Sequence, residues 1–504
     1  MKAARKTAAP TQASRRQTAA EPPSSAPVSA PVSAPVFPPA LPPGLAAALA
    51  YLPRWLAHQM RITEQPGLSV AVAHQGRVVA EFALGMADAT MPLTPRHRFR
   101  VASHSKTFTA AAVLLLREHG CWRLDDAVGD FVPGLHPQVA AATLAQLLSH
   151  SAGLVRDGGD AGQWSDRRPF LNEAELRADL ARGPVLPPNT RFKYSNHGYG
   201  LLGLAIAAVT GEPYARWVAR EIVAASGLRE TTPDAPTSLL AEGTRFARGH
   251  SAKWPLGRRV HIPGDNPTHA LAAATGFVST AADLVRFYAS LAPDAATRVL
   301  GADSRRELVR RQWRDPYGTV ERWYGLGTLS GGTAGAGPEW DHFGHTGGFQ
   351  GTLSRTVHVP AQALTISMLT NAADGLAGVW VDGALQLLRS ALQHGSPGAR
   401  TAAWQGRWWG LWGAMDLLPG TDKVLVANPA LLNPVLDAPQ IEPGPSTDEG
   451  RIVLAGGFAS HGEGARLERD ARGRVQALWL GGTRLQSEAR AAQELTRRYD
   501  RPGG

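Results

Sequence analysis

The residue pair that first suggests chemistry is a serine followed three positions later by a lysine, Ser103 and Lys106. A helix is expected from Phe108 to His119, and the pair lies at its start. Three-residue spacing there places both side chains on one face, and the helix N-terminus favours an oxyanion on the serine. A lysine in a partly desolvated cleft has a lowered pKa and can accept the serine proton. The pair therefore predicts an activated nucleophile; a helix-capping serine beside a solvated lysine is the alternative.

The rarity of lysine supports the chemical interpretation. Only six of the 52 basic residues are lysines, and among these only Lys106 has a serine three positions before it. Arginine keeps its proton in proteins, whereas a buried lysine can lose it. A lysine in a chain that otherwise uses arginine therefore points to a need for a deprotonatable amine.

A second candidate element is Tyr194-Ser195-Asn196, expected in a loop before a helix at Leu201–Val209. A tyrosine beside a cationic lysine has its phenolate favoured and can shuttle protons. The amide of Asn196 offers a donor and an acceptor for a substrate carbonyl. The alternative is that Tyr194 is an ordinary aromatic residue of a turn.

A third candidate element is the glycine-flanked segment His345-Thr346-Gly347-Gly348, which precedes a strand expected at Gly351–His358. Glycines allow a substrate backbone to lie close against a strand edge. The backbone N–H of Gly348 can also donate to an oxyanion.

The remaining pattern indicates the elements that position these residues. An antiparallel hairpin is expected at Gly67–Ala73 and Arg77–Leu84, after a helix at Leu45–Met60. A helix at Ala281–Leu291, opened by a Ser279-Thr280 cap, precedes late strands and a final helix through Leu392. Strands first, helices in the middle, then strands and a helix predict an α+β fold with a helical insertion.

Both ends of the chain differ from this body. Residues 1–43 are rich in proline, alanine and serine, carry an excess of basic residues and predict a disordered tail. A composition break at 394–400 precedes residues 404–504, where short apolar runs alternate with turns, which predicts a small all-β barrel. The expected domains are therefore the tail at 1–43, a body at 44–395 and a barrel at 404–504.

The order Ser-x-x-Lys, Tyr-x-Asn, His-Thr-Gly, at intervals of about 90 and 150 residues, resembles the penicillin-recognising serine hydrolases. The Tyr-x-Asn variant is similar to the branch containing class C β-lactamases, DD-carboxypeptidases and D-aminopeptidases. Segments 147–154 and 275–284 are similar to connecting segments of that family, and the resemblance spans about residues 62–392. Residues 404–504 resemble the lipocalin-like barrels appended to some D-aminopeptidase relatives.

The resemblance implies an antiparallel sheet flanked by helices, an all-helical lobe, and an active site between them. Ser103 would be acylated, Lys106 would be its base, and Tyr194 would carry protons to the leaving group. The backbone N–H groups of Ser103 and Gly348 would form the oxyanion hole. The other expected substrate-binding residues are Asn196, His345, Thr346 and Gly347. His345 stands where most β-lactamases have the lysine of a Lys-Thr-Gly box, which shifts the expectation towards a peptidase, amidase or esterase.

The amino-acid composition limits the classes of partner that the chain is expected to bind. The net charge is +10, but the body has no basic run interleaved with aromatic residues, so no nucleic-acid partner is expected. No apolar run is long enough to cross a membrane, and the single cysteine excludes an intramolecular disulfide. No cofactor or metal is expected, since His461 and Glu463 are too few for a metal site. Prolines interrupt the apolar runs behind Arg15 and Arg16, which favours the cytoplasm; a misassigned start would allow the periplasm.

The expected function is that of a serine hydrolase that forms an acyl-enzyme on a small amide, a peptide or an ester. The peptide could contain D-amino acids. Two alternatives remain open, a β-lactamase proper and a catalytically silent protein that binds a ligand in the same cleft. The partner in each case is a small molecule or short peptide, and the oligomeric state is not indicated.

Overall fold

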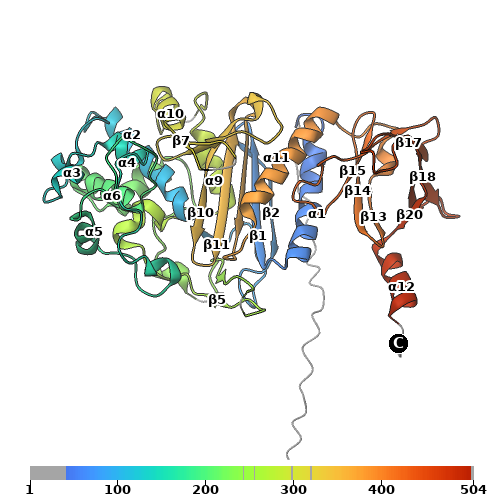
Figure 1. Ribbon diagram of the computed structural model, residues 1–504, viewed down its shortest axis with the longest axis horizontal. Helices are drawn as coiled ribbons and strands as arrows, with labels where there is room; N and C mark the ends of the chain where they lie inside the picture. Colours follow the sequence, from blue (N-terminus) through green and yellow to red (C-terminus); the bar gives the residue numbers. More distant parts are fainter. Residues whose placement is uncertain (1–40, 242, 255, 297–298, 318–319, 501–504) are drawn as a thin grey trace, which may run out of the picture. The chain divides into compact units, whose positions relative to one another are not determined.

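The computed structural model describes residues 41–241, 243–254, 256–296, 299–317 and 320–500 (Figure 1). All of these residues belong to one compact unit, residues 32–504. The expected tail at 1–43 lies, apart from its last three residues, outside the described residues.

An antiparallel sheet of eight strands forms the centre of the body. Its order is β2-β1-β12-β11-β10-β9-β8-β7, so the first hairpin pairs with the last strand of the body, with Val70 opposite Met368. The strands are β1 (Gly67–His74), β2 (Arg77–Gly85), β7 (Trp313–Asp315), β8 (Arg322–Tyr324), β9 (Leu329–Gly331), β10 (His342–Phe349), β11 (Thr352–Val359) and β12 (Leu364–Thr370).

Helices cover both faces of this sheet (Figure 1). Helices α1 (Leu45–Thr63) and α11 (Ala377–His394) cover one face, where Trp55 and Trp380 pack against Val70, Ile366 and Met368. The alternate side chains of the same strands pack against the helical lobe on the other face. Strand β12 is buried along its whole length, as expected for a strand covered on both sides.

The helical lobe lies between β2 and β7 in the sequence. Its helices are α2 (Ser105–Glu118), α3 (Pro137–Ala140), α4 (Leu144–Leu148), α5 (Glu173–Leu180), α6 (Asn196–Thr210), α7 (Tyr214–Val218), α8 (Thr237–Leu240), α9 (Ala281–Ser290) and α10 (Ala302–Val309). The predicted cap of α9 is present, because Thr280 Oγ1 accepts from the N–H of Asp283. No helix within the described residues is both long and apolar enough to cross a bilayer.

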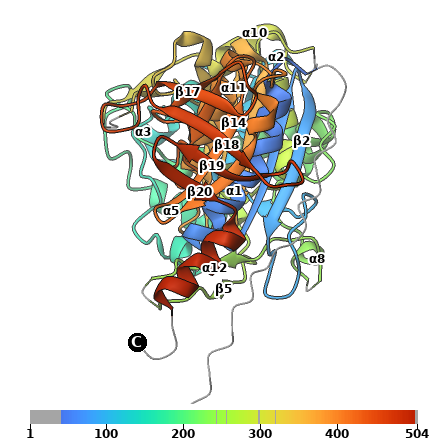
Figure 2. The ribbon, with the colours of Figure 1, turned by 90° about the vertical axis from the view of Figure 1, so that its right-hand side faces the viewer.

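Residues 406–486 form the predicted barrel, which is closed by eight antiparallel strands. The strands are β13 (Gly406–Gly410), β14 (Gly413–Pro419), β15 (Val424–Ala427), β16 (Gln440–Pro443), β17 (Glu449–Leu454), β18 (Gly464–Arg469), β19 (Val475–Leu480) and β20 (Thr483–Gln486). Trp404 and Trp408 belong to its core, as the expected packing role of the tryptophans requires. A final helix, α12 (Glu488–Tyr499), follows the last strand and was not expected (Figure 2).

Helix α1 contacts the barrel through a buried polar cluster. The hydroxyl of Tyr51 donates to Asp416 at 2.6 Å, and Arg407 donates two hydrogen bonds of 2.7 Å to the same carboxylate. Gln59 Nε2 donates to the carbonyl oxygen of Pro429 at 2.7 Å. Because a buried carboxylate needs its partners, this cluster fixes where α1 and strand β14 meet.

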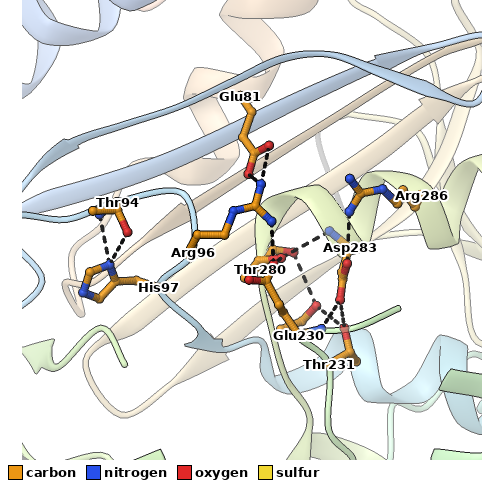
Figure 3. Close-up of polar contacts among 10 residues, drawn as sticks. Glu81, Thr94, Arg96, His97, Glu230, Thr231, Thr280, Asp283 and Arg286 are labelled. Atoms are coloured by element: carbon orange, nitrogen blue, oxygen red, sulfur yellow. Dashed lines mark hydrogen bonds and ion pairs between the residues drawn. The ribbon is translucent and has the colours of Figure 1, made fainter. Parts of the chain in front are cut away.

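A second polar network ties the lobe to the sheet (Figure 3). Arg96 donates two hydrogen bonds to Glu81 of β2, at 2.7 and 2.9 Å, and one to Glu230 at 3.0 Å. Asp283 of α9 accepts from the N–H of Glu230 at 2.8 Å and from the hydroxyl of Thr231 at 3.0 Å. One connected set of bonds therefore holds β2, the segment at 230–231 and α9 together.

Replacing the buried centre of this network should destabilise the fold. Asp283→Ala removes the acceptor of the Glu230 N–H and one of the two hydrogen-bond partners of the Thr231 hydroxyl, so we expect the free energy of unfolding to fall by about 1–3 kcal/mol. Urea denaturation measures this change. The control is Asp303→Ala, whose side chain is 92% exposed and whose loss should change stability by less than about 0.5 kcal/mol. Equal effects of the two substitutions would contradict the prediction.

Candidate active site

Ser103 lies in a tight turn, η1 (Ala102–His104), directly before α2. The residue before it, Ala102, has φ of 46°, a left-handed conformation that is unfavourable for residues with a side chain. The turn is held in place because the N–H of Val101 donates to the carbonyl oxygen of Phe277 at 3.0 Å. This strained turn leaves Ser103 half-buried while its neighbours on both sides are buried.

Lys106 is completely buried, and its amine contacts three oxygen atoms. Nζ lies 3.2 Å from Ser103 Oγ, 2.7 Å from Asn196 Oδ1 and 2.9 Å from the carbonyl oxygen of Ala274. Burial lowers the pKa of the Lys106 ammonium well below its ordinary value. A neutral amine has two N–H bonds and one lone pair, so donation to Asn196 and Ala274 directs the lone pair towards Ser103.

Asn196 is held by a residue that the sequence patterns did not single out. Its Nδ2 donates to Asp157 Oδ1 at 2.6 Å, and the same carboxylate oxygen accepts from Trp164 Nε1 at 2.9 Å. Because a carboxylate can only accept, the amide oxygen of Asn196 must face Lys106. The side chain is buried, and its Oδ1 and one N–H of Nδ2 are bonded within the protein, so the second N–H of Nδ2 is the group left for the predicted contact with a substrate carbonyl.

Tyr194 approaches Ser103 from the loop before α6. Its hydroxyl donates to Ser103 Oγ at 2.9 Å, and Lys106 Nζ lies 4.7 Å from the centre of its ring. Desolvation by the surrounding side chains raises the pKa of the Tyr194 phenol above its ordinary value. Burial therefore disfavours the expected phenolate and favours the protonated hydroxyl as a donor to Ser103.

His150 positions the Tyr194 loop. Its Nδ1 accepts from the backbone N–H of Ser195 at 3.1 Å. Its ring centre lies 4.1 Å from that of Tyr194 and 4.6 Å from that of Tyr324. His150 is therefore a structural residue that orients the candidate proton carrier.

His345 lies in strand β10 with its ring buried. Nδ1 lies 2.6 Å from the carbonyl oxygen of Thr346, and Nε2 lies 3.1 Å from the hydroxyl of Tyr324. A carbonyl can only accept, so Nδ1 carries the proton and Nε2 accepts from Tyr324. Burial, with a contribution from Lys106, lowers the pKa of His345 to about 3. Burial therefore disfavours the charged form of the His345 ring.

Glycine at position 347 is required by the close approach of β10 to the serine turn. A Cβ at Gly347 would lie 2.1 Å from the carbonyl oxygen of Val101 and 2.4 Å from Ser354 Oγ. Thr346 and Gly348 are exposed, whereas Gly347 between them is buried. The edge of β10 that carries Thr346 and Gly348 is therefore open next to Ser103.

Of the residues predicted from the sequence, four are directly bonded to one another: Ser103, Lys106, Tyr194 and Asn196. Strand β10 brings Thr346 to Gly348 beside them. The sequence patterns missed Asp157, His150 and Tyr324. The only signal was position, since His150 lies within segment 147–154 and Asp157 lies shortly after it.

The neutral state of His345 can be tested directly. A histidine whose pKa is lowered is neutral at every pH above that value, so the His345 ring should not titrate between about pH 5.5 and 8.5. Nitrogen NMR of the imidazole rings over this range measures it, and the signals that disappear in His345→Asn identify the residue. A midpoint inside this range would contradict the burial of the ring.

Comparison with known proteins agrees with this geometry. The family model described as Beta-lactamase matches residues 52–389. Penicillin-binding protein 4 of Amycolatopsis lactamdurans is 30% identical over 323 residues, which is 61% of this chain and 81% of that protein. Protein flp of Staphylococcus aureus (strain COL) is 29% identical over 169 residues, and this chain covers only 34% of its length.

Solved structures extend the comparison. The octameric penicillin-binding protein homologue from Pyrococcus abyssi has a TM-score of 0.60 and 21% identity, covering 86% of this chain and 99% of that one; at this identity the likeness shows the fold alone. A D-stereospecific amidohydrolase from Streptomyces sp. has a TM-score of 0.53 and 26% identity, covering 65% of this chain and 94% of that one. The predicted sheet, lobe and barrel are all present. Because the family model matches residues 52–389, the chain belongs to the beta-lactamase family of serine hydrolases.

Proposed function

We propose that the chain hydrolyses a short peptide or amide through an acyl-enzyme on Ser103, and that the leaving group carries a carboxylate. The observation that carries the first part is the position of Ser103 Oγ, which accepts from Tyr194 at 2.9 Å and lies 3.2 Å from the Lys106 amine. A serine between a neutral base and a neutral donor is prepared for nucleophilic attack.

In the acylation step, Ser103 Oγ attacks the substrate carbonyl carbon while its proton moves to the lone pair of Lys106. The carbonyl oxygen becomes an oxyanion, for which the backbone N–H groups of Ser103 and Gly348 are the proposed donors. The transferred proton makes Lys106 cationic in a buried site, where burial disfavours the charge. Protonated Lys106 therefore gives up its proton readily in the next step, which needs one.

In the second half of acylation, the bond between the carbonyl carbon and the leaving nitrogen breaks. Tyr194 donates its hydroxyl proton to that nitrogen and is reprotonated by Lys106, so both residues end neutral. The raised pKa of Tyr194 suits this role, because the phenol stays protonated until a stronger acceptor is present. Deacylation repeats the steps with water in place of serine and returns the proton to Ser103 Oγ.

The charge at the entrance supports a leaving group with a carboxylate. The guanidinium of Arg156 lies 5.9 Å from the centre of the Tyr194 ring, and its side chain is 63% exposed. Its Nε lies 3.3 Å from Asp157 Oδ2. Because Tyr194 is the proposed donor to the leaving nitrogen, Arg156 lies on the side where that group departs.

The configuration of the substrate is the remaining element of the proposal. The Streptomyces relative, 26% identical, is described as D-stereospecific, so we infer that this chain also accepts a D-residue at the cleaved bond. A β-lactam carries a comparable carboxylate, and it is included in the test as a competing substrate.

The acyl-enzyme is tested by intact-mass measurement of the protein with a fluorophosphonate, a D-alanyl-D-alanine peptide, its L-isomer, p-nitrophenyl butyrate and a cephalosporin. We expect one adduct on the wild type and none on Ser103→Ala, with turnover of the D-peptide. An adduct that persists in Ser103→Ala would disprove the nucleophile. Labelling by none of the reagents would favour a silent binding protein, and turnover of the cephalosporin alone would favour a β-lactamase.

The base is tested by Lys106→Arg. Arginine keeps a positive charge but has no available lone pair, so kcat/KM should fall at least about 100-fold, as in Lys106→Ala. Lys253→Arg, a surface substitution that can keep its ion pair with Glu64, is the matched control and should retain activity. If Lys106→Arg kept most of the wild-type rate, Lys106 would act only through its charge.

The role of Arg156 is tested with two substrates that share an acyl part and differ only in a free or amidated leaving-group carboxylate. Arg156→Gln should reduce the preference for the free acid about 3–10-fold, in kcat/KM, as expected for an exposed ion contact. Arg472→Gln, which removes a charge from an exposed barrel turn, should leave the ratio unchanged. An unchanged ratio in Arg156→Gln would disprove the carboxylate contact while leaving the acyl-enzyme untouched.

A further inference from the structure

Asp157 is a buried carboxylate to which the proposed reaction assigns no step. It lies in the loop that follows α4, and its side chain is only 9% exposed. Its Oδ1 accepts from Asn196 Nδ2 at 2.6 Å and from Trp164 Nε1 at 2.9 Å, and its Oδ2 lies 3.3 Å from Arg156 Nε. The carboxylate is therefore surrounded by donors, and one of these donors, Asn196, also contacts the Lys106 amine.

The orientation of the Asn196 amide decides which group the Lys106 amine meets. With Oδ1 towards Lys106, 2.7 Å from Nζ, the amide accepts an N–H and leaves the lone pair of the amine for the proton of Ser103. With the amide turned by 180°, Nδ2 would face the amine and donate to that same lone pair. The two orientations have nearly the same shape, so packing alone does not choose between them.

Asp157 makes this choice because a carboxylate only accepts hydrogen bonds. Turning the Asn196 amide would replace the 2.6 Å hydrogen bond by a contact between two acceptor oxygens, Asn196 Oδ1 and Asp157 Oδ1, and would leave both without a donor there. An asparagine at position 157 has a donor and an acceptor of its own and would allow either orientation. The orientation of Asn196 therefore depends on the carboxylate and not merely on a polar side chain of that shape.

The charge of Asp157 also acts on the base. Burial is the main influence and lowers the pKa of the Lys106 amine; the charge of Asp157 raises that pKa, and the charge of Arg156 lowers it. In the proposed acylation step Lys106 receives the proton of Ser103 and becomes cationic. A negative charge beyond Asn196 stabilises this cationic state, so the same carboxylate supports the base before and after the proton moves.

We propose that Asp157 is a positioning residue of the serine–lysine site: its carboxylate holds the Asn196 amide with the oxygen towards Lys106 and so keeps the lone pair of Lys106 for Ser103. This inference rests on the proposed function, because it concerns the base of the same reaction. If Asp157 were merely structural, it would hold its loop through the bond to Trp164, and its effect would not pass through Asn196.

The test measures how fast a fluorophosphonate labels Ser103 in the full-length protein, followed by intact mass. Asp157→Asn keeps the shape of the side chain but allows the turned amide, so labelling should slow at least about tenfold. Asp166→Asn removes the same charge from an exposed position nine residues further along the chain and should leave the rate within about twofold. A wild-type rate in Asp157→Asn would overturn the proposal.

A double-mutant cycle separates positioning from a structural role. In an Asn196→Ala background there is no amide left to orient, so adding Asp157→Asn should slow labelling by less than about a further threefold. A structural Asp157 would cost the same factor with and without Asn196, and that additive result would overturn the proposal. Thermal melting of each variant confirms that the labelled proteins are folded.

Carbon NMR of lysine labelled at Cε gives a readout that does not need the reaction. The chain has six lysines, so few signals are present, and the one that disappears in Lys106→Arg belongs to Lys106. Asp157→Asn should move this signal, and Asp166→Asn should not. If the wild type is not labelled by the fluorophosphonate, the proposed function fails, and the NMR signal alone decides whether Asp157 acts on the amine. An unmoved signal overturns the inference in either case.

Discussion

The candidate active site depends on the burial of a single amine, that of Lys106. A completely buried ammonium is unfavourable, so burial lowers the pKa of Lys106, and two of its N–H groups face fixed acceptors, Asn196 and Ala274. Each acceptor is itself held, Asn196 by Asp157 and the Ala274 segment by the bond from the Phe277 N–H to Ser105 Oγ. The direction of the lone pair towards Ser103 follows from these surroundings and not from Lys106 alone.

The need to hold these acceptors around Lys106 explains why the site is built from segments that are far apart in the sequence. The nucleophile and base come from the start of α2, Asn196 from the start of α6, and the Ala274 carbonyl from the segment before α9. The open edge of β10 reaches the same point because Gly347 lets the strand lie against the Val101 carbonyl. The lobe and the sheet therefore meet at the serine, and the network around Arg96 and Asp283 secures that junction.

The sequence predicted the elements whose signal is local. Periodicity located the first hairpin and the helix at Ala281, and the Ser103-Lys106 spacing identified the central bond of the site. It could not predict that Asn196 would bond to Asp157, because that contact depends on how the 157 loop folds back on α6. For the same reason it favoured a phenolate at Tyr194, since burial is a property of the tertiary structure. Helix α12 was missed because its polar composition hides its narrow apolar stripe.

Neutrality inside the cleft has a consequence for where substrate charge is recognised. A lysine at position 345, as in the Lys-Thr-Gly pattern, would place a cation near Lys106, where burial disfavours charge. The histidine present here is neutral and bonded to Tyr324. An anionic group on the substrate must then find its partner outside the buried layer, and Arg156, exposed beside Tyr194, is a cation in that position. Under the proposed function, the histidine at 345 and the exposed Arg156 are two parts of one arrangement, in which the chemistry uses neutral groups and the surface supplies the charge.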